Sequence, residues 1–346
     1  MTVRVGINGF GRIGRSFYRA ILAKGSGAGV ELVAVNDPFG DSETMAFLLK
    51  HDSVGGVLKN EVKVSDGGFS VDGNEVRKLE SRDPAEIPWG DHGVDVVIES
   101  TGIFTAREKA AGHIAGGAKR VIISAPSGDA DAMICMGVND EVFDAAQHTV
   151  ISNASCTTNC LAPMAKVLND RFGIEQGLIT TVHAYTSDQQ LQDMATVSRS
   201  GKPDLRRMRA AALSIIPSST GAARAIGTVL PDLKGRLDGT SLRVPVPTGS
   251  ITDLVATLRA ETTKEEINAA FAEAAGAASY RGVLQYTEET LVSADIVGNP
   301  SSCIFSAPDT MVSGRMVKIL GWYDNEWGYS NRLVDLTAIV GAKIKG

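Results

Sequence analysis

The sequence has few cysteines and no long uninterrupted apolar run. Its four cysteines are too few and too scattered in 346 residues for a disulfide framework. Cys156 and Cys160 have a C-x-x-x-C spacing, but no nearby pair of Cys or His completes a tetrahedral zinc set. No apolar run is long enough to span a membrane. These absences predict a protein without a disulfide framework, a metal site or a membrane partner.

Basic residues are not in excess, since 34 Lys and Arg stand against 40 Asp and Glu and the net charge is −6. A nucleic-acid-binding surface needs a basic excess or a clustered basic face, so we expect no nucleic-acid partner. The start, MTVRVGING, lacks a basic region followed by an apolar region and a cleavage site, which predicts a cytoplasmic protein. The length exceeds what one hydrophobic core usually serves, so we expect two domains.

A glycine motif follows the first predicted strand directly. The strand covers residues 3–7, and Gly9-Phe-Gly11-Arg-Ile-Gly14 then opens a helical pattern. In this G-x-G-x-x-G context Gly9 permits a tight turn, Gly11 lets the backbone approach a pyrophosphate, and Gly14 packs helix on strand. The motif predicts a dinucleotide site.

The second predicted strand, residues 30–36, ends in Asp37, at about the twenty-residue distance from the glycines that the motif requires. A carboxylate at this place accepts hydrogen bonds from both ribose hydroxyls and repels a 2′-phosphate. Asp37 therefore favours NAD over NADP. Its alternative role is that of a turn residue before Pro38.

The rest of the N-terminal half predicts a Rossmann-type doubly wound parallel sheet, and the fold class is α/β. Residues 60–79 contain turn signals of an antiparallel appendage, and parallel strands are expected at residues 94–98, 120–124 and 148–151, with a helix over 105–115. Strand ends face the ligand crevice in such sheets, so Thr101, Gly102 and Ser124 are candidate cofactor neighbours.

The stretch Ser152 to Asn159, SNASCTTN, lies where a β-branched run gives way to a helical pattern. A thiol at a helix N-terminus is expected to have a lowered pKa, which makes Cys156 the candidate nucleophile. His183, in a predicted strand over 179–184, is the candidate base that pairs with the thiolate. Cys160 either packs as a small apolar side chain or acts as a redox partner of Cys156.

The C-terminal half predicts an α+β domain with a mixed, mainly antiparallel sheet and helices on one face. Strands are expected at 237–246, 251–260, 282–286, 303–306 and 316–323, and a capping box at Thr263 starts a helix. The basic run 202–209 is either a solvated loop or an anion site, and Pro217-Ser-Ser-Thr-Gly221 is expected to open a helix beside it. After Asn325 the chain is helical and is expected to return to the first domain.

These residues resemble the phosphorylating glyceraldehyde-3-phosphate dehydrogenases over nearly the whole chain. The motifs that stand in the family's order are INGFGRIGR, VND, ESTG, SNASCTTNC, HAYT, DLRR, PSSTGAA, SLRVPVP and WYDNEWGYSNR. The resemblance implies an NAD-dependent enzyme of glycolysis and gluconeogenesis that converts glyceraldehyde 3-phosphate and inorganic phosphate to 1,3-bisphosphoglycerate. It further implies a Cys156 hemithioacetal and thioester, His183 as general base and acid, and a homotetramer.

The resemblance also assigns binding residues. Thr186 and Arg243 match the pocket for the substrate's phosphate. The attacking phosphate's pocket is matched by Ser155, Thr157, Thr220, Gly221 and Arg207, with the choice of Arg207 over Arg206 resting on its spacing from STG. Arg12 and Ile13 match the pyrophosphate turn, Arg82 and Ser124 match further cofactor contacts, and Asn325 matches the nicotinamide carboxamide contact.

Three departures and three alternatives accompany this resemblance. The loop 189–203 is longer than in the family, its Leu-Pro pair is missing, and TGS at 248–250 replaces the family's frequent NVS. An erythrose-4-phosphate dehydrogenase shares the fold, the cysteine and the histidine, although HAYT and PSSTGAA favour the first assignment. A binding or regulatory protein that retains the fold is the second alternative. A cysteine hydrolase is the third, and it leaves the glycine motif and Asp37 unexplained. The expected domains are 1–155 with the helix 325–346, and 156–324.

Overall fold

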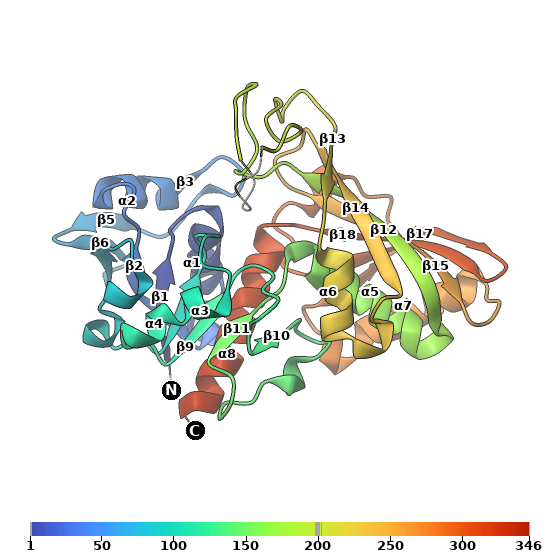
Figure 1. Ribbon diagram of the computed structural model, residues 1–346, viewed down its shortest axis with the longest axis horizontal. Helices are drawn as coiled ribbons and strands as arrows, with labels where there is room; N and C mark the ends of the chain where they lie inside the picture. The colour runs from blue at the N-terminus through green and yellow to red at the C-terminus, as the bar shows by residue number, and fades with distance from the viewer. Residues whose placement is uncertain (1, 198–200, 202, 346) are drawn as a thin grey trace. The chain divides into compact units, whose positions relative to one another are not determined.

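The computed structural model describes residues 2–197, 201 and 203–345, which belong to two compact units (Figure 1). Unit 1 comprises Met1–Ile134, Asp140–Ala154 and Ser330–Gly346, and unit 2 comprises Cys135–Asn139 and Ser155–Tyr329. Within the described part of the chain, no helix is both long enough and apolar enough to cross a membrane.

Unit 1 contains a nine-stranded sheet that confirms the expected Rossmann-type class. In spatial order its strands are β10 (Ala132–Met133), β11 (Val150–Ser152), β9 (Arg120–Ile123), β8 (Val96–Glu99), β1 (Val3–Asn8), β2 (Val30–Asn36), β7 (Asn74–Leu79), β6 (Gly68–Val71) and β5 (Val62–Ser65). All neighbours from β10 to β7 are parallel, whereas β7, β6 and β5 are antiparallel. The expected appendage therefore extends the edge of the main sheet.

The order of strands reverses between β1 and β8. From β1 the chain proceeds outward through β2 on one side and returns to β8 on the other. The carboxyl ends of β1 and β8, at Asn8 and Glu99, thus flank the switch point where such sheets bind ligands. Both strands are almost continuously buried, which explains their mainly apolar sequences.

The helices of unit 1 are α1 (Arg12–Lys24), α2 (Ser42–Lys50), α3 (Arg107–Ala110), α4 (Gly112–Ala115) and the part of α8 (Trp327–Lys345) from Ser330 onward. The helical stretch expected over 105–115 is present as two single helical turns that meet at Ala111. Gly112, which has a low helix propensity, begins the second turn. A short hairpin of β3 (His51–Asp52) and β4 (Gly56–Val57) follows α2.

Unit 2 contains a seven-stranded mixed sheet, as the sequence predicts. In spatial order its strands are β13 (Ile216–Ser219), β14 (Leu237–Val244), β12 (Ile174–Ala184), β15 (Ser250–Leu258), β18 (Met316–Tyr323), β17 (Cys303–Ser313) and β16 (Leu284–Thr287). The pairs β12 with β14 and β16 with β17 are parallel, and the other pairs are antiparallel.

Three helices pack on this sheet, namely α5 (Cys156–Phe172), α6 (Ala222–Val229) and α7 (Lys264–Gly276) (Figure 1). Alternate residues of β15 are buried, which is the pattern of a sheet with one covered face. The Thr263 capping box is confirmed, because Thr263 Oγ1 accepts from the Glu266 N–H while the Glu266 carboxylate accepts from the Thr263 N–H.

One helix start in unit 2 differs from the expectation. Pro217 and Ser218 do not open a helix, because they pair with β14 as part of β13, and α6 begins only at Ala222. The expected surface segment 187–203 has no regular helix in its described part, and residues 198–200 and 202 lie outside the described residues.

Candidate active site

Cys156 is the first residue of α5. The chain turns sharply before it, since Ala154 adopts φ 55°, a left-handed conformation that costs a residue with a Cβ roughly 1–2 kcal/mol. Ser155 is the N-cap, and its Oγ accepts from the Thr158 N–H at 2.9 Å. The local sequence therefore places the thiol at a capped helix N-terminus, as predicted.

His183 lies in β12 with its ring buried, and its Nε2 is 3.4 Å from Cys156 Sγ. Its other ring nitrogen, Nδ1, is 2.7 Å from the Ala184 carbonyl oxygen, and a ring proton on Nδ1 would be donated to that oxygen. In this tautomer Nε2 carries a lone pair that faces the thiol. The pair is therefore arranged for proton transfer from Sγ to Nε2.

Arg243 pairs directly with His183 in the parallel register of β12 and β14. Arg243 Nη1 is 3.0 Å from the Ala184 carbonyl oxygen, 3.1 Å from Thr186 Oγ1 and 2.8 Å from His183 Nδ1. Its two hydrogens serve the two oxygens, and its charge lies against the imidazole. Two residues of adjacent strands thus bring an anion-binding side chain beside the base.

Burial shifts both members of the pair toward their neutral forms. It lowers the pKa of His183 to about 3, and the Arg243 charge adds to this effect. Burial also raises the pKa of the Cys156 thiol, although the Arg243 charge and hydrogen bonds from Thr157 oppose that shift. This direction is opposite to the lowered thiol pKa that the sequence predicts, because desolvation is the largest contribution.

Tyr323, which the sequence analysis did not identify as a site residue, packs against His183 and against Thr157, the residue after Cys156. Its hydroxyl is 2.8 Å from both Thr157 Oγ1 and Thr181 Oγ1, and its ring meets the His183 ring edge-on at 5.9 Å between centroids. Tyr323 belongs to the motif WYDNEWGYSNR, so a signal was present, but only the pairing of strands reveals its contacts. Thr157, an expected phosphate residue, is thus buried against Tyr323.

Asn325 has its amide oriented by a serine. The Ser250 hydroxyl donates to Asn325 Oδ1 at 2.9 Å, and the same Ser250 Oγ accepts from the Ala184 N–H at 3.0 Å. The Asn325 NH₂ is then directed away from Ser250 as a donor. Ser250 belongs to the TGS that departs from the family's frequent NVS, and its contact is with the residue expected at the nicotinamide carboxamide.

Two residues expected to bind anions, Thr186 and Arg207, both contact the carboxylate of Asp188, which the sequence analysis did not identify. Thr186 Oγ1 donates to Asp188, and Arg207 forms an ion pair with the same carboxylate. Arg207 Nη2 also donates to Ser218 Oγ at 3.0 Å, whereas Arg206 reaches only the Pro217 carbonyl at 3.4 Å.

The other expected phosphate residues lie at two helix starts. The Thr220 hydroxyl oxygen accepts from the Ala222 N–H at 3.2 Å, and Gly221 is the N-cap of α6. Ser155 caps α5. Helix N-termini of this kind stabilise anions through their partial positive charge.

In unit 1 the glycine motif has the geometry of a dinucleotide turn. Gly9 has φ 91°, and a Cβ on it would lie 2.8 Å from the Thr101 nitrogen, so only glycine fits. A Cβ on Gly14 would lie 2.4 Å from the Gly9 carbonyl oxygen, which explains the close packing of α1 on β1. Around Gly11, by contrast, no described atom beyond its neighbours lies within 4 Å of that position. The turn is open at the one glycine where a pyrophosphate would approach.

The remaining expected cofactor residues surround the same edge of unit 1. Asp37 accepts from the Phe10 and Phe39 N–H groups at 2.9 Å each, so its two oxygens are held in place. The Arg82 guanidinium lies 5.3 Å over the Phe39 ring. Arg12 forms an ion pair with Asp52 at 3.0 Å.

Three more expected residues follow strands of this edge. Gly102, with φ 71°, follows Thr101 after β8, and Ser124 follows β9 and donates its N–H to the Glu99 carbonyl. Ile13 lies in the first turn of α1. The edge thus supplies backbone donors, a fixed carboxylate and two exposed or half-exposed cations, a set that fits a dinucleotide.

Comparison with known proteins supports this arrangement. The NAD binding domain of glyceraldehyde 3-phosphate dehydrogenase matches residues 3–107, and the C-terminal domain of the same family matches residues 155–325. The chain is 60% identical over 345 residues to the glyceraldehyde-3-phosphate dehydrogenase of Streptomyces coelicolor, which covers 99% of this chain and 100% of that protein. It is 56% identical over 348 residues to that of Mycobacterium avium, with 99% and 100% covered.

Proposed function

This chain belongs to the glyceraldehyde-3-phosphate dehydrogenase family, and we propose that it catalyses the NAD-dependent oxidative phosphorylation of D-glyceraldehyde 3-phosphate to 1,3-bisphosphoglycerate. One observation carries the proposal. Cys156 Sγ lies 3.4 Å from a His183 nitrogen whose lone pair faces it, beside the cation of Arg243. This is the arrangement of a nucleophile, its base and an anion-binding group.

We propose that NAD is held by the edge of unit 1. The N–H groups of Gly11, Arg12 and Ile13 bind the pyrophosphate at the start of α1, Gly9 and Gly14 shape the turn, and Asp37 accepts from the ribose hydroxyls. Arg82, Thr101, Gly102 and Ser124 line the rest of the site. The family resemblance assigns the carboxamide contact to the Asn325 NH₂, which Ser250 orients. When bound, the nicotinamide supplies the hydride acceptor.

The first chemical step is addition of Cys156 to the aldehyde. Sγ forms a bond to the aldehyde carbon, His183 Nε2 takes the thiol proton, and that proton passes to the aldehyde oxygen to give a hemithioacetal. The Ala184 carbonyl keeps the His183 ring in the required tautomer.

His183 then acts twice more. It takes the hemithioacetal hydroxyl proton as the carbon gives up its hydride, which leaves a thioester on Cys156. Inorganic phosphate attacks the thioester carbon, the C–S bond breaks, and His183 returns its proton to the departing sulfur. N–H groups at the start of α5 stabilise the developing oxyanion. The product is an acyl phosphate.

Two anion pockets complete the proposal. Thr186 and Arg243 bind the phosphate of the substrate, and Arg243 already donates to Thr186 at 3.1 Å. Arg207, Thr220, Gly221, Ser155 and Thr157 serve the attacking phosphate. A bound phosphate would replace Asp188 as the acceptor of the hydrogen bonds from Arg207 and Thr186.

The test is a substrate and acceptor comparison. Purified protein should reduce NAD with glyceraldehyde 3-phosphate only when inorganic phosphate is present, and equal turnover in phosphate-free buffer would overturn the assignment. Erythrose 4-phosphate in a parallel assay tests the alternative sugar substrate. Replacing NAD by NADP in both assays measures the preference set by Asp37.

We further propose the organisation of the whole enzyme. The NAD-binding domain is residues 1–155 with the helical segment 325–346, and the catalytic domain is 156–324. The chain acts in the cytoplasm as a homotetramer in glycolysis and gluconeogenesis, with no nucleic-acid or membrane partner. Mass measurement of the purified protein in solution tests the tetramer.

A further inference from the structure

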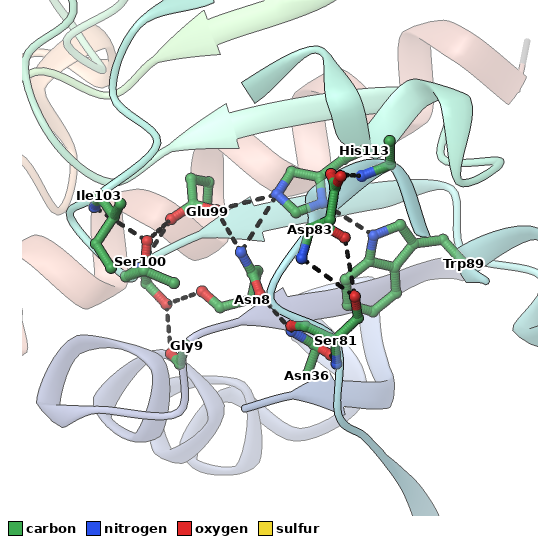
Figure 2. Close-up of polar contacts among 12 residues, drawn as sticks. Asn8, Gly9, Asn36, Ser81, Asp83, Trp89, Glu99, Ser100, Ile103 and His113 are labelled. Atoms are coloured by element: carbon green, nitrogen blue, oxygen red, sulfur yellow. Dashed lines mark hydrogen bonds and ion pairs between the residues drawn. The ribbon is translucent and has the colours of Figure 1, made fainter. Parts of the chain in front are cut away.

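A buried carboxylate lies at the carboxyl end of β8 in unit 1 (Figure 2). The side chain of Glu99 is fully enclosed. Its Oε2 accepts from Asn8 Nδ2 at 2.6 Å and from His113 Nε2 at 3.0 Å, and its Oε1 accepts from the backbone N–H of Thr101 at 2.9 Å and from the Thr101 hydroxyl. Four donors converge on one carboxylate, which satisfies a buried anion.

The protonation of His113 follows from its second neighbour. Trp89 Nε1 is 3.0 Å from His113 Nδ1, and an indole nitrogen can only donate. Nδ1 is therefore the acceptor, and the proton of the neutral ring is on Nε2, from which it is donated to Glu99. His113 is thus a neutral donor, and Glu99 carries the charge of the network.

The network extends along the edge of the sheet. Asn8 Oδ1 accepts from Asn36 Nδ2 at 2.8 Å, which ties β1 to β2. Asn36 also exchanges two hydrogen bonds with the backbone of Ser81, at 2.8 and 2.9 Å. On the other side, the Ser100 hydroxyl donates to the Gly9 carbonyl at 2.7 Å (Figure 2). The ends of β1, β2 and β8 are thereby joined through side chains.

Each of these junctions immediately precedes a residue expected to bind the cofactor. The neighbouring pairs are Asn8 and Gly9, Asn36 and Asp37, Ser81 and Arg82, and Ser100 and Thr101. None of the four first members is assigned a contact with the cofactor. Asn8 donates to Glu99 directly, and Asn36 donates to Asn8. The Ser100 hydroxyl donates to the carbonyl of Gly9, in the neighbouring turn.

We propose that Glu99 is a positioning residue for NAD, whose buried charge holds the glycine turn, the Asp37 turn and the Thr101 turn in their binding arrangement. The inference rests on the proposed NAD-dependent function. A fixed arrangement of the three turns before binding removes an ordering cost that would otherwise reduce the affinity. Glu99 acts through these turns and not by contact with the cofactor.

The test is the substitution Glu99→Gln, which preserves shape but turns one acceptor end of the carboxyl into a donor. Each carboxylate oxygen of Glu99 accepts from two donors, so in either orientation of the glutamine amide its NH₂ group would face two other donors. We expect the dissociation constant for NAD, measured by calorimetry or fluorescence titration, to rise at least about 10-fold. The KM for glyceraldehyde 3-phosphate and kcat at saturating NAD should change by less than about 3-fold.

A matched control lies at the other end of the same strand. Asp95, which precedes β8, is also buried and accepts from the Arg4 N–H at 3.0 Å, Lys119 Nζ at 2.9 Å and Lys345 Nζ at 2.6 Å. Asp95→Asn should lower the melting temperature and leave the NAD dissociation constant within about 2-fold, because no cofactor turn is attached there. An equal rise in both variants would overturn the proposal in favour of general destabilisation.

A second pair of variants serves if Glu99→Gln does not fold. His113→Gln retains a donor for Glu99, whereas His113→Leu removes it, so only the leucine variant should weaken NAD binding. Equal NAD affinity in these two variants, or in Glu99→Gln and wild type, would refute the role of the network. Failure of the wild-type protein itself to bind NAD would instead refute the proposed function.

Discussion

The cofactor edge of unit 1 and the Cys156 environment of unit 2 both bury polar groups, but they satisfy them differently. Glu99 receives four donors and is ionised. In unit 2 burial raises the pKa of Cys156 and lowers that of His183, and the buried Arg243 Nε has no hydrogen-bond partner among the described residues. One region holds a fixed carboxylate, whereas in the other burial disfavours the charged forms of the thiol and the imidazole that lie beside the Arg243 cation.

The difference follows from what each region does. A binding edge gains when its groups are already in place, because little is then ordered on binding. A nucleophile and a base must change protonation state during the reaction, so hydrogen bonds that fully satisfy one protonation state would oppose the change to the other. Incomplete satisfaction reduces stability locally, which is a common feature of active sites. Each prediction below changes a residue of one region and measures the effect expected for that region alone.

The largest effect is expected for Cys156→Ser. A hydroxyl is a far weaker nucleophile than a thiol toward this carbonyl, so turnover should fall by about four orders of magnitude or more. The NAD dissociation constant should stay within about 2-fold, because the glycine turn and Asp37 are unchanged. NADH formation and NAD titration are the two measurements. Wild-type-like turnover would refute the assignment of Cys156 as the nucleophile. Loss of NAD binding would show that the Cys156 environment and the cofactor edge do not act independently.

His183→Asn should lower kcat by about 10²- to 10⁴-fold, the usual contribution of a general base. Cys156 keeps its place at the α5 N-terminus, so residual turnover should remain and should exceed that of Cys156→Ser. Steady-state kinetics with saturating NAD and phosphate measure the difference. Unchanged kcat would show that the 3.4 Å contact of His183 with Sγ has no catalytic role.

Asp37→Asn should alter cofactor choice rather than chemistry. Loss of the carboxylate weakens the ribose contact and removes the repulsion of a 2′-phosphate, so the ratio of kcat/KM for NAD to that for NADP should fall by about 10- to 100-fold. Asp41→Asn is the matched control, because Asp41 lies on the same side of unit 1 but caps α2 through the Thr44 N–H. A control variant with the same loss of preference would contradict the assignment.

The smallest effect is a difference in acid stability. Partial burial alone would raise the pKa of Asp131, but hydrogen bonds from Arg107, Val150 and Thr149 outweigh it and hold that pKa well below its usual value. The stabilisation is therefore present above the unfolded pKa and is lost as the pH falls through the folded one.

Asp131→Asn removes this ionisation and should lower the melting temperature by a few degrees at pH 7, with a smaller loss between pH 7 and 3 than in wild type. The charge-matched control Glu108→Gln changes an exposed side chain of α3. Parallel pH profiles of the melting temperature in wild type and Asp131→Asn would contradict the prediction.

Much of the fold and of the candidate site was predictable because its signals are local. A strand, a glycine turn and a helix are adjacent in residues 3–24, and their order reveals the dinucleotide turn directly. Cys156 was recognisable for the same reason, since the capping Ser155 and the helix follow β11 at once. The structure departs from the predictions in three places: Pro217 and Ser218 pair with β14 before α6 begins, the helical stretch 105–115 is divided at Ala111, and burial raises the pKa of Cys156.

The sequence by itself determined the class of fold, the candidate nucleophile and the candidate cofactor turn, because hydrophobic period, glycine spacing and capping act between near neighbours. Only the tertiary structure decided the surroundings of these residues. Parallel pairing of β12 with β14 places Arg243 beside His183, burial reverses the expected direction of the Cys156 pKa, and the fold brings His113 to Glu99. These effects depend on distance and desolvation between segments far apart in the chain, which no local pattern encodes.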